Sequence, residues 1–121
     1  MAVEKYIDYI DDPNDTYEEY LEKAKKYNFR CVFFDGEDLD SYQKGLEILK
    51  GTDIVLAGAI DFPEGVMSLE EKMKDFEKMA AMGVPEIDYV LNQKAVESRD
   101  FETIEKEMTT FLGKIAGKII L

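Results

Sequence analysis

Short apolar runs alternate with longer segments of helical periodicity along the whole chain. Five of these runs are short and rich in Val, Ile and aromatic residues, a composition typical of β-strands. They cover residues 5–9, 30–34, 53–59, 86–91 and 118–121. The pattern therefore predicts strands separated by helices from one end of the chain to the other.

Capping residues indicate where the helices between these strands begin and end. Thr16 is placed to accept the first free amides of one helix, and Gly51 is placed to end the next. Ser68 with Glu71 three residues later forms a capping box for a third helix, which ends at Gly83. The apolar stripes of the predicted helices are Tyr17, Tyr20, Leu21, Ala24 and Tyr27; Tyr42, Leu46 and Leu49; Leu69, Met73, Phe76 and Ala80; and, after a start near Asp100, Ile104, Met108, Phe111 and Leu112.

This alternation predicts an α/β fold with a parallel sheet, because parallel neighbours need a crossover connection and a helix is the usual one. Two architectures fit the pattern: an open doubly wound sheet, or half of a (β/α)8 barrel, which needs about 250 residues when complete. The periodicity does not choose between them. No linker or low-complexity segment interrupts the chain, so residues 1–121 are expected to form a single domain.

Composition narrows the chemistry that the chain could perform. Its 121 residues are 45% hydrophobic, enough for one core, and include no His and a single Cys. Without His the chain lacks the usual general base and the imidazole metal ligand, so an enzyme would depend on carboxylates, Lys, Tyr or Cys. Cys31 cannot form an intrachain disulfide on its own, which suits a reducing compartment.

The charge balance excludes several classes of partner. The net charge of −12 arises from 27 acidic and 15 basic residues, and acids outnumber bases in both halves of the chain. Nucleic acid and anionic membrane surfaces are therefore poor partners. No apolar run approaches the roughly 20 residues of a membrane span, and the N-terminus lacks the apolar core of a signal peptide. A soluble, cytoplasmic protein is expected.

Acidic residues gather after the predicted strands, where both architectures place their functional sites. Crowded carboxylates could transfer protons or hold Mg²⁺. Asp also favours loops and helix caps for local hydrogen bonding, and the pattern leaves both interpretations open. The residues are Asp8 at the end of the first predicted strand, then Asp11, Asp12 and Asp15, Asp35, Glu37, Asp38 and Asp40, and Asp61 and Glu64 in the following loops.

Asp88 differs from these loop acids because it lies inside the fourth predicted strand, in the sequence Ile87-Asp-Tyr-Val-Leu91. A strand of a parallel sheet that is covered on both faces should be apolar throughout. An ionised carboxylate buried there is costly unless it has partners. A functional role for Asp88 is therefore the favoured interpretation.

Two motifs in the second half of the chain carry a family resemblance. Residues 55–65 combine small and apolar residues with a Phe-Pro-x-Gly turn, and residues 83–92 contain the Glu-Ile-Asp strand. They resemble the third strand with its loop, and the fourth strand, of the class I deoxyribose-phosphate aldolases. The resemblance continues through Ala95, Ser98, Asp100 and Phe101 to the last strand, and in the first half it includes Ile7, Asp8, Pro13, Thr16, Asn28 and Phe29.

The resemblance implies strands one to five of a TIM barrel, as a half barrel of about five parallel strands and four crossover helices. Family members cleave 2-deoxyribose 5-phosphate to glyceraldehyde 3-phosphate and acetaldehyde through a Schiff base on a lysine of strand six. A second lysine on strand seven and the phosphate-binding loops after strands seven and eight also lie beyond the matched part. The isolated chain is therefore expected to be inactive, and Lys94 and Lys118 do not occupy the family's lysine position.

Of the family's chemical residues, the proton-relay aspartate of strand four corresponds to Asp88, and an active-site aspartate at the end of strand one corresponds to Asp8. Both would move protons through water or orient the lysine. No cofactor or metal is implied, and the partner of the full barrel would be a phosphosugar or aldehyde.

The chain departs from the family where Asp61 replaces Gly or Asn. It also departs where residues 33–36 replace a Cys-bearing run, and in an acidic first loop at residues 10–13. These acids add negative charge where an anionic substrate would enter. Two other functions stay open: a non-catalytic half barrel that forms a homodimer through its open sheet edges, and a receiver-like phosphorylatable domain.

Overall fold

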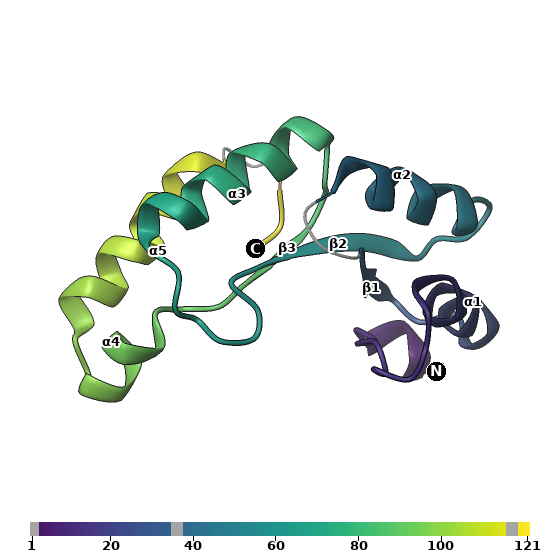
Figure 1. Ribbon diagram of the computed structural model, residues 1–121, viewed down its shortest axis with the longest axis horizontal. Coiled ribbons are helices and arrows are strands. Elements are labelled where there is room, and N and C mark those ends of the chain that lie inside the picture. The colour runs from purple at the N-terminus through teal and green to yellow at the C-terminus, as the bar shows by residue number, and fades with distance from the viewer. Residues whose placement is uncertain (1–2, 35–37, 116–118) are drawn as a thin grey trace. The chain divides into compact units, whose positions relative to one another are not determined.

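The computed structural model describes residues 3–34, 38–115 and 119–121 and shows an α/β arrangement with an open parallel sheet (Figure 1). The strands run in the order β1-β2-β3. The chain divides into two compact units, Met1–Gly58 and Ala59–Leu121, so the boundary between them falls within strand β2. Each unit is described by itself. None of the described helices is long and apolar enough to cross a bilayer.

The first unit contains a short 3-10 helix, two α-helices and parallel pairing between β1 and β2. Its elements are η1 (Val3–Tyr6), α1 (Tyr17–Tyr27), β1 (Cys31–Phe33), α2 (Leu39–Ile48) and the start of β2 (Val55–Ile60). Cys31 pairs with Val55, and Phe33 pairs with Ala57. On its other side β1 forms one parallel bridge, between Cys31 and Asp8. The first predicted strand is therefore present only as this bridge.

The predicted strand over residues 5–9 is wrong at its start, where η1 covers Val3–Tyr6 instead. Backbone hydrogen bonds from the Arg30 amide to the Ile7 carbonyl (3.0 Å) and from the Tyr9 amide to the Cys31 carbonyl (2.9 Å) keep the rest in a parallel register. No residue of η1 is buried, so the apolar and aromatic side chains that suggested a strand here do not pack into the core.

Local capping explains where the helices of this unit begin and end. The Thr16 hydroxyl accepts from the Glu19 amide, and Glu19 accepts in return from the Thr16 amide, so the predicted N-cap is confirmed as a full capping box. The α2 helix begins at its N-cap Asp38 and ends at its C-cap Leu49. The predicted end at Gly51 is therefore two residues too late, although Gly51 does adopt a positive φ of 85° in the following turn.

Buried side chains from α1 and β1 form the core of the first unit. The Tyr20 hydroxyl donates to the Tyr9 carbonyl (2.6 Å) and accepts from the Phe33 amide (2.9 Å), which satisfies its polar group inside the core. The single cysteine, Cys31, forms no disulfide and is fully buried, as expected for a small core residue. The buried apolar residues include Tyr20, Leu21, Ala24, Cys31, Val32, Phe34, Tyr42, Leu49, Ile54, Leu56 and Ala57.

The second unit begins within β2 and contains three further helices and one strand. These elements are α3 (Leu69–Met82), β3 (Ile87–Tyr89), α4 (Gln93–Ser98) and α5 (Phe101–Ile115). The capping box of Ser68 with Glu71 and the left-handed C-cap at Gly83 (φ 83°) are confirmed at the two ends of α3. The helix α4 was not predicted, because its six residues are too few to show a helical period.

The core of this unit lies between α3, α5 and the strands. Phe76 of α3 meets Phe111 of α5 edge-on with ring centroids 5.4 Å apart, and Tyr89 of β3 lies 4.2 Å from the same Phe111 ring. The Val90 amide donates to the Ile60 carbonyl at the end of β2 (3.2 Å).

On the other side of β3, Glu86 forms a parallel bridge with Ile120. The predicted fifth strand is thus present as one parallel bridge, and Lys118 lies outside the described residues. The α/β fold with a parallel, open sheet is confirmed.

Candidate functional site

Asp88 lies in the middle of β3 with an exposed side chain, so the expectation that it is buried is wrong. Successive side chains of a strand point to opposite faces. Ile87 is buried and Tyr89 packs on Phe111, whereas Asp88 leaves the strand on the other face. The carboxylate of Asp88 therefore carries no desolvation cost from burial, and a ligand can reach it.

Asp88 lines an open hollow of about 490 Å³, a size within the usual range for small-molecule sites. The hollow is mostly apolar, and Asp88 is the one charged side chain among the residues that line it in the described part of the chain. Such a site could enclose the carbon skeleton of a small molecule beside one proton-transferring group. The lining residues are Phe62, Asp88, Tyr89, Val90, Leu91, Met108, Phe111 and Leu121.

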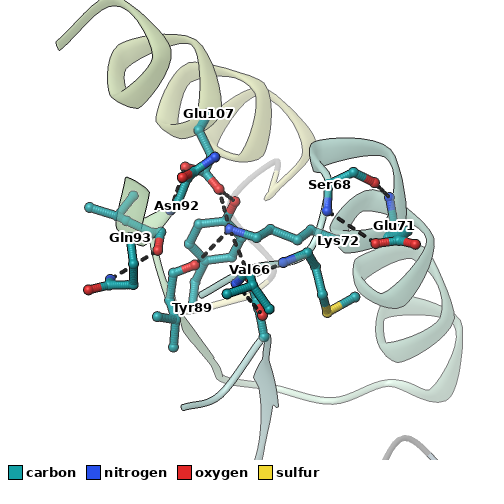
Figure 2. Close-up of polar contacts among 12 residues, drawn as sticks. Val66, Ser68, Glu71, Lys72, Tyr89, Asn92, Gln93 and Glu107 are labelled. Carbon is teal, nitrogen blue, oxygen red and sulfur yellow. Dashed lines mark hydrogen bonds and ion pairs between the residues drawn. The ribbon is translucent and has the colours of Figure 1, made fainter. Parts of the chain in front are cut away.

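A fully buried lysine, Lys72, lies next to the end of β3 (Figure 2). Its ammonium donates a hydrogen bond of 2.8 Å to the Val90 carbonyl and a second to the Glu107 carboxylate, and it lies 4.7 Å from the centre of the Tyr89 ring. A buried ammonium is costly without such partners. The amine is therefore fully buried and engaged by its partners, so it is not available to attack a substrate carbonyl.

Lys72 was not among the predicted site residues, although its position in the sequence carries one signal. Lys72 stands three residues after Leu69 and four before Phe76, which places it on the apolar stripe of α3. A charged residue on such a stripe must either reach the surface with its long side chain or find buried partners. Lys72 finds buried partners.

Glu107 of α5 is the acceptor that joins this cluster together. It accepts from Lys72, from the Tyr89 hydroxyl and, through its second oxygen, from the Asn92 amide (3.1 Å). Burial raises the pKa of Glu107, but the hydrogen bonds from Lys72 and Tyr89 outweigh burial and hold that pKa below its usual value. Burial and the adjacent Glu107 raise the pKa of Tyr89, so its hydroxyl stays a proton donor.

Asp61, at the turn after β2, completes the charge balance of the cluster. Its carboxylate lies 3.3 Å from the Lys72 ammonium and accepts from the amides of Val66 (3.0 Å) and Met67 (2.9 Å). The residue is buried and has a positive φ of 59°, a conformation that Gly, Asn and Asp adopt most readily. The expectation that Asp61 adds charge at an entrance is therefore wrong, because its carboxylate is buried and paired.

Asp8, the other predicted site residue, lies in the first unit. Its side chain is exposed and forms an ion pair with Arg30, with 2.6 Å between the carboxylate and Nε. Asp8 and Asp88 belong to different units, and each remains a predicted site residue in its own unit.

The other loop acids mostly make local contacts. Asp12 accepts from the Asn14 amide (2.8 Å), Asp15 pairs with Lys23 (2.7 Å), and Asp38 caps α2. These contacts are of the kind that the local hydrogen-bonding interpretation of the acids predicts. Asp35 and Glu37 lie outside the described residues.

Known proteins resemble this chain over its full length. A deoxyribose-phosphate aldolase of Brevibacillus brevis is 31% identical over 127 positions, which cover all of this chain and 55% of that protein. One of Mycoplasmopsis pulmonis is 30% identical over 125 positions, with the same coverage. The chain thus spans about half the length of these curated relatives. No protein-family model matches the chain.

Solved structures show the same fold. The chain superposes with a TM-score of 0.73 on QR15, an aldolase, at 20% identity, covering 97% of this chain and 52% of that one. It superposes with a TM-score of 0.69 on a candidate deoxyribose-phosphate aldolase from Coccidioides immitis, at 21% identity and 88% coverage of this chain. The resemblance to the deoxyribose-phosphate aldolases and the α/β fold of part of their barrel are both confirmed.

Proposed function

We propose that these 121 residues supply strands one to five of a deoxyribose-phosphate aldolase-like barrel, in which Asp88 transfers protons to and from the reacting carbon. The main support is the position of Asp88: its accessible carboxylate lines an apolar hollow. The chain that contains it resembles the aldolases in sequence and in fold. The substrate of the complete site would be 2-deoxyribose 5-phosphate or a related aldehyde.

In this chemistry a lysine amine attacks the aldehyde carbonyl, water leaves, and an iminium ion forms. The iminium withdraws electrons from the adjacent carbon, so cleavage of the carbon–carbon bond releases the acceptor aldehyde and leaves an enamine, whose carbon a carboxylic acid then protonates. In the bond-forming direction the carboxylate removes that proton to regenerate the enamine, which attacks the aldehyde. Asp88 would exchange this proton directly or through one water molecule. The apolar wall that includes Phe62 and Met108 would limit the access of other water to the intermediate.

The proposal places the Schiff-base lysine outside these 121 residues, because Lys72 is fully buried and paired with Glu107, and Lys94 is an exposed lysine of α4. The isolated chain should therefore show no turnover. Incubation with acetaldehyde and borohydride, followed by peptide mapping, tests this statement. Slow modification spread over the exposed lysines is expected, and rapid modification of a single lysine would contradict the proposal.

A chimera tests the role of Asp88 directly. The chain would replace the matched 55% of the Brevibacillus brevis relative, so that the remainder supplies the rest of that protein. Asp88→Asn should lower kcat of the chimera by about 10²- to 10⁴-fold, the usual contribution of general acid–base catalysis. Glu97→Gln, which changes an exposed acid of α4, is the matched control and should leave kcat unchanged. Equal activity of the Asp88→Asn variant would overturn the assignment.

A second candidate function is a homodimer of half barrels, and one observation favours it. Helix α5 carries an exposed apolar stripe at Phe101, Met108 and Leu112, with 71%, 45% and 57% of these residues exposed. Large exposed apolar patches mark interaction sites. Sedimentation of the 121-residue chain should then show a dimer that Leu112→Glu dissociates and Lys106→Gln, at an exposed position of α5 away from this stripe, does not. A compact monomer would contradict this function. As an aldolase-like enzyme, the protein would work in the cytoplasm, where Cys31 stays reduced.

A further inference from the structure

We infer that Lys72 is a positioning residue, which together with Glu107 and Tyr89 fixes the end of β3 and thereby the direction in which Asp88 leaves the strand. The inference rests on the proposed function of Asp88. It assigns a role to the cluster of Lys72, Glu107, Tyr89 and Asp61, which the proposed proton transfer does not itself use. Figure 2 shows Lys72, Tyr89 and Glu107 of this cluster.

The backbone of β3 needs support from outside the sheet. The strand has three residues, and among the described residues its bridge to Ile120 lies at Glu86, before Asp88. After Asp88, the Val90 amide bonds to Ile60. The carbonyl of Val90 would have no partner in a short ladder, and buried backbone groups are almost always paired. Here the partner is the ammonium of Lys72.

Glu107 supports the next backbone group along the chain. Its carboxylate accepts from the amide of Asn92, two residues beyond the Val90 carbonyl that Lys72 holds. The same carboxylate binds both Lys72 and the Tyr89 hydroxyl. Side chains from α3 and α5 therefore bind both the backbone after Asp88 and the side chain of the residue next to it. These contacts involve Tyr89, Val90 and Asn92, whereas the side chain of Asp88, which leaves the strand on the opposite face from Tyr89, is exposed.

The chemistry of the cluster favours positioning over a gain in stability alone. Replacing a buried ion pair with apolar residues of similar volume is often neutral or stabilising, so such a pair is weak evidence of a stability function. What a charged pair provides and an apolar pair does not is fixed geometry. The ammonium and the carboxylate each form several directional hydrogen bonds at once. An apolar substitute would fill the same space and would leave the Val90 carbonyl and the Asn92 amide without partners.

Hydrogen exchange of the intact 121-residue chain tests the structural half of the inference. Lys72→Met and Tyr89→Phe are compared with the wild-type chain, and Lys78→Met, an exposed lysine of the same helix, is the matched control. In Tyr89→Phe, which keeps Lys72 and Glu107, the Asn92 amide should exchange roughly tenfold faster while the amides of α1 keep their protection. Lys72→Met should give a larger increase. Unchanged exchange at Asn92 in Tyr89→Phe, or an increase of the same size in the amides of α1 in that variant, would overturn the inference.

The chimera described above tests the functional half. Tyr89→Phe and Lys72→Met should lower kcat with little change in KM, because substrate still binds while the proton-transfer group is less well directed. If kcat/KM falls because KM rises by a similar factor, the substitution has damaged the site in general, and the positioning role is overturned. An inactive chimera with wild-type Asp88 would count against the proposed function. Exchange at Asn92 in the 121-residue chain would still test the positioning role, because that measurement does not need activity. The two failures are thus distinguishable.

Discussion

The carboxylate of Asp61 lies 3.3 Å from the ammonium of Lys72, and both groups are buried. This pair resolves an apparent conflict in the sequence. Asp61 stands in a tight turn with positive φ, and its charge is balanced by a lysine eleven residues later. Asp61 and the buried Lys72 therefore form one ion pair, and a substitution of either residue should leave the charge of the other unbalanced.

Removal of Lys72 should destabilise the protein strongly. Lys72→Met leaves Asp61 and Glu107 buried without a counter-charge, and breaking a buried pair in this way costs about 3–5 kcal/mol. Lys78→Met on the exposed side of the same helix should change the free energy of unfolding by less than about 0.5 kcal/mol. Urea denaturation measures both values.

A double variant separates the ion pair from simple packing. If charge imbalance causes the loss, Lys72→Met combined with Glu107→Leu should recover part of the stability that Lys72→Met alone removes. If the losses of unfolding free energy in the two single variants simply add in the double variant, each side chain contributes independently. The ion pair between Lys72 and Glu107 would then have no interaction energy of its own.

Three glycines should respond differently to alanine. At Gly65 a Cβ would lie 2.6 Å from the Leu91 carbonyl oxygen, and φ is 66°, so Gly65→Ala should cost about 2–4 kcal/mol. Gly83 has a φ of 83° but open space, which predicts a loss of about 1–2 kcal/mol. Gly113 lies within α5 in open space, so Gly113→Ala should stabilise by about 0.5–1 kcal/mol. Thermal or urea denaturation of the three variants would reveal any different order.

Stability should fall with acid partly through Glu107. Its pKa in the folded protein lies below that of the unfolded chain, about 4.3 for Glu. The folded state therefore gains stability from Glu107 above that pH, and loses it as pH falls through the lower, folded pKa. Glu107→Gln should flatten the decline in unfolding free energy between about pH 5 and pH 2. An unchanged slope would show that Glu107 is not the group that takes up the proton.

Alkaline titration should distinguish the buried tyrosines from the others. Burial raises the pKa of Tyr20 and Tyr89, whereas tyrosines in an unfolded chain ionise near pH 10. Stability from these residues is complete below about pH 10 and is lost as pH rises toward their folded pKa values. Phenolate absorbance should show fewer than seven tyrosines ionising with the ordinary pKa in the folded protein, and all seven in urea. Tyr89→Phe should reduce the delayed fraction.

Local sequence signals predicted much of the fold because their physics is local. The capping boxes at Thr16 and Ser68 and the left-handed Gly83 are settled by hydrogen bonds within a few residues, so they could be read directly. The 3-10 helix at Val3–Tyr6 was misread as a strand because a run of a few residues does not distinguish the two. The short helix α4 was missed for the same reason.

By itself the sequence determined the alternation of strands with the four longer helices, most of the ends of those helices, and the family resemblance that marks Asp88 and Asp8. These features depend on neighbours along the chain. Only the tertiary structure decided that Asp88 is exposed and that Lys72 meets Asp61, Glu107 and the end of β3. Lys72 and Glu107 are 35 residues apart in sequence. Whether a charged side chain is buried and paired depends on which distant segments pack around it, and no local pattern encodes that meeting.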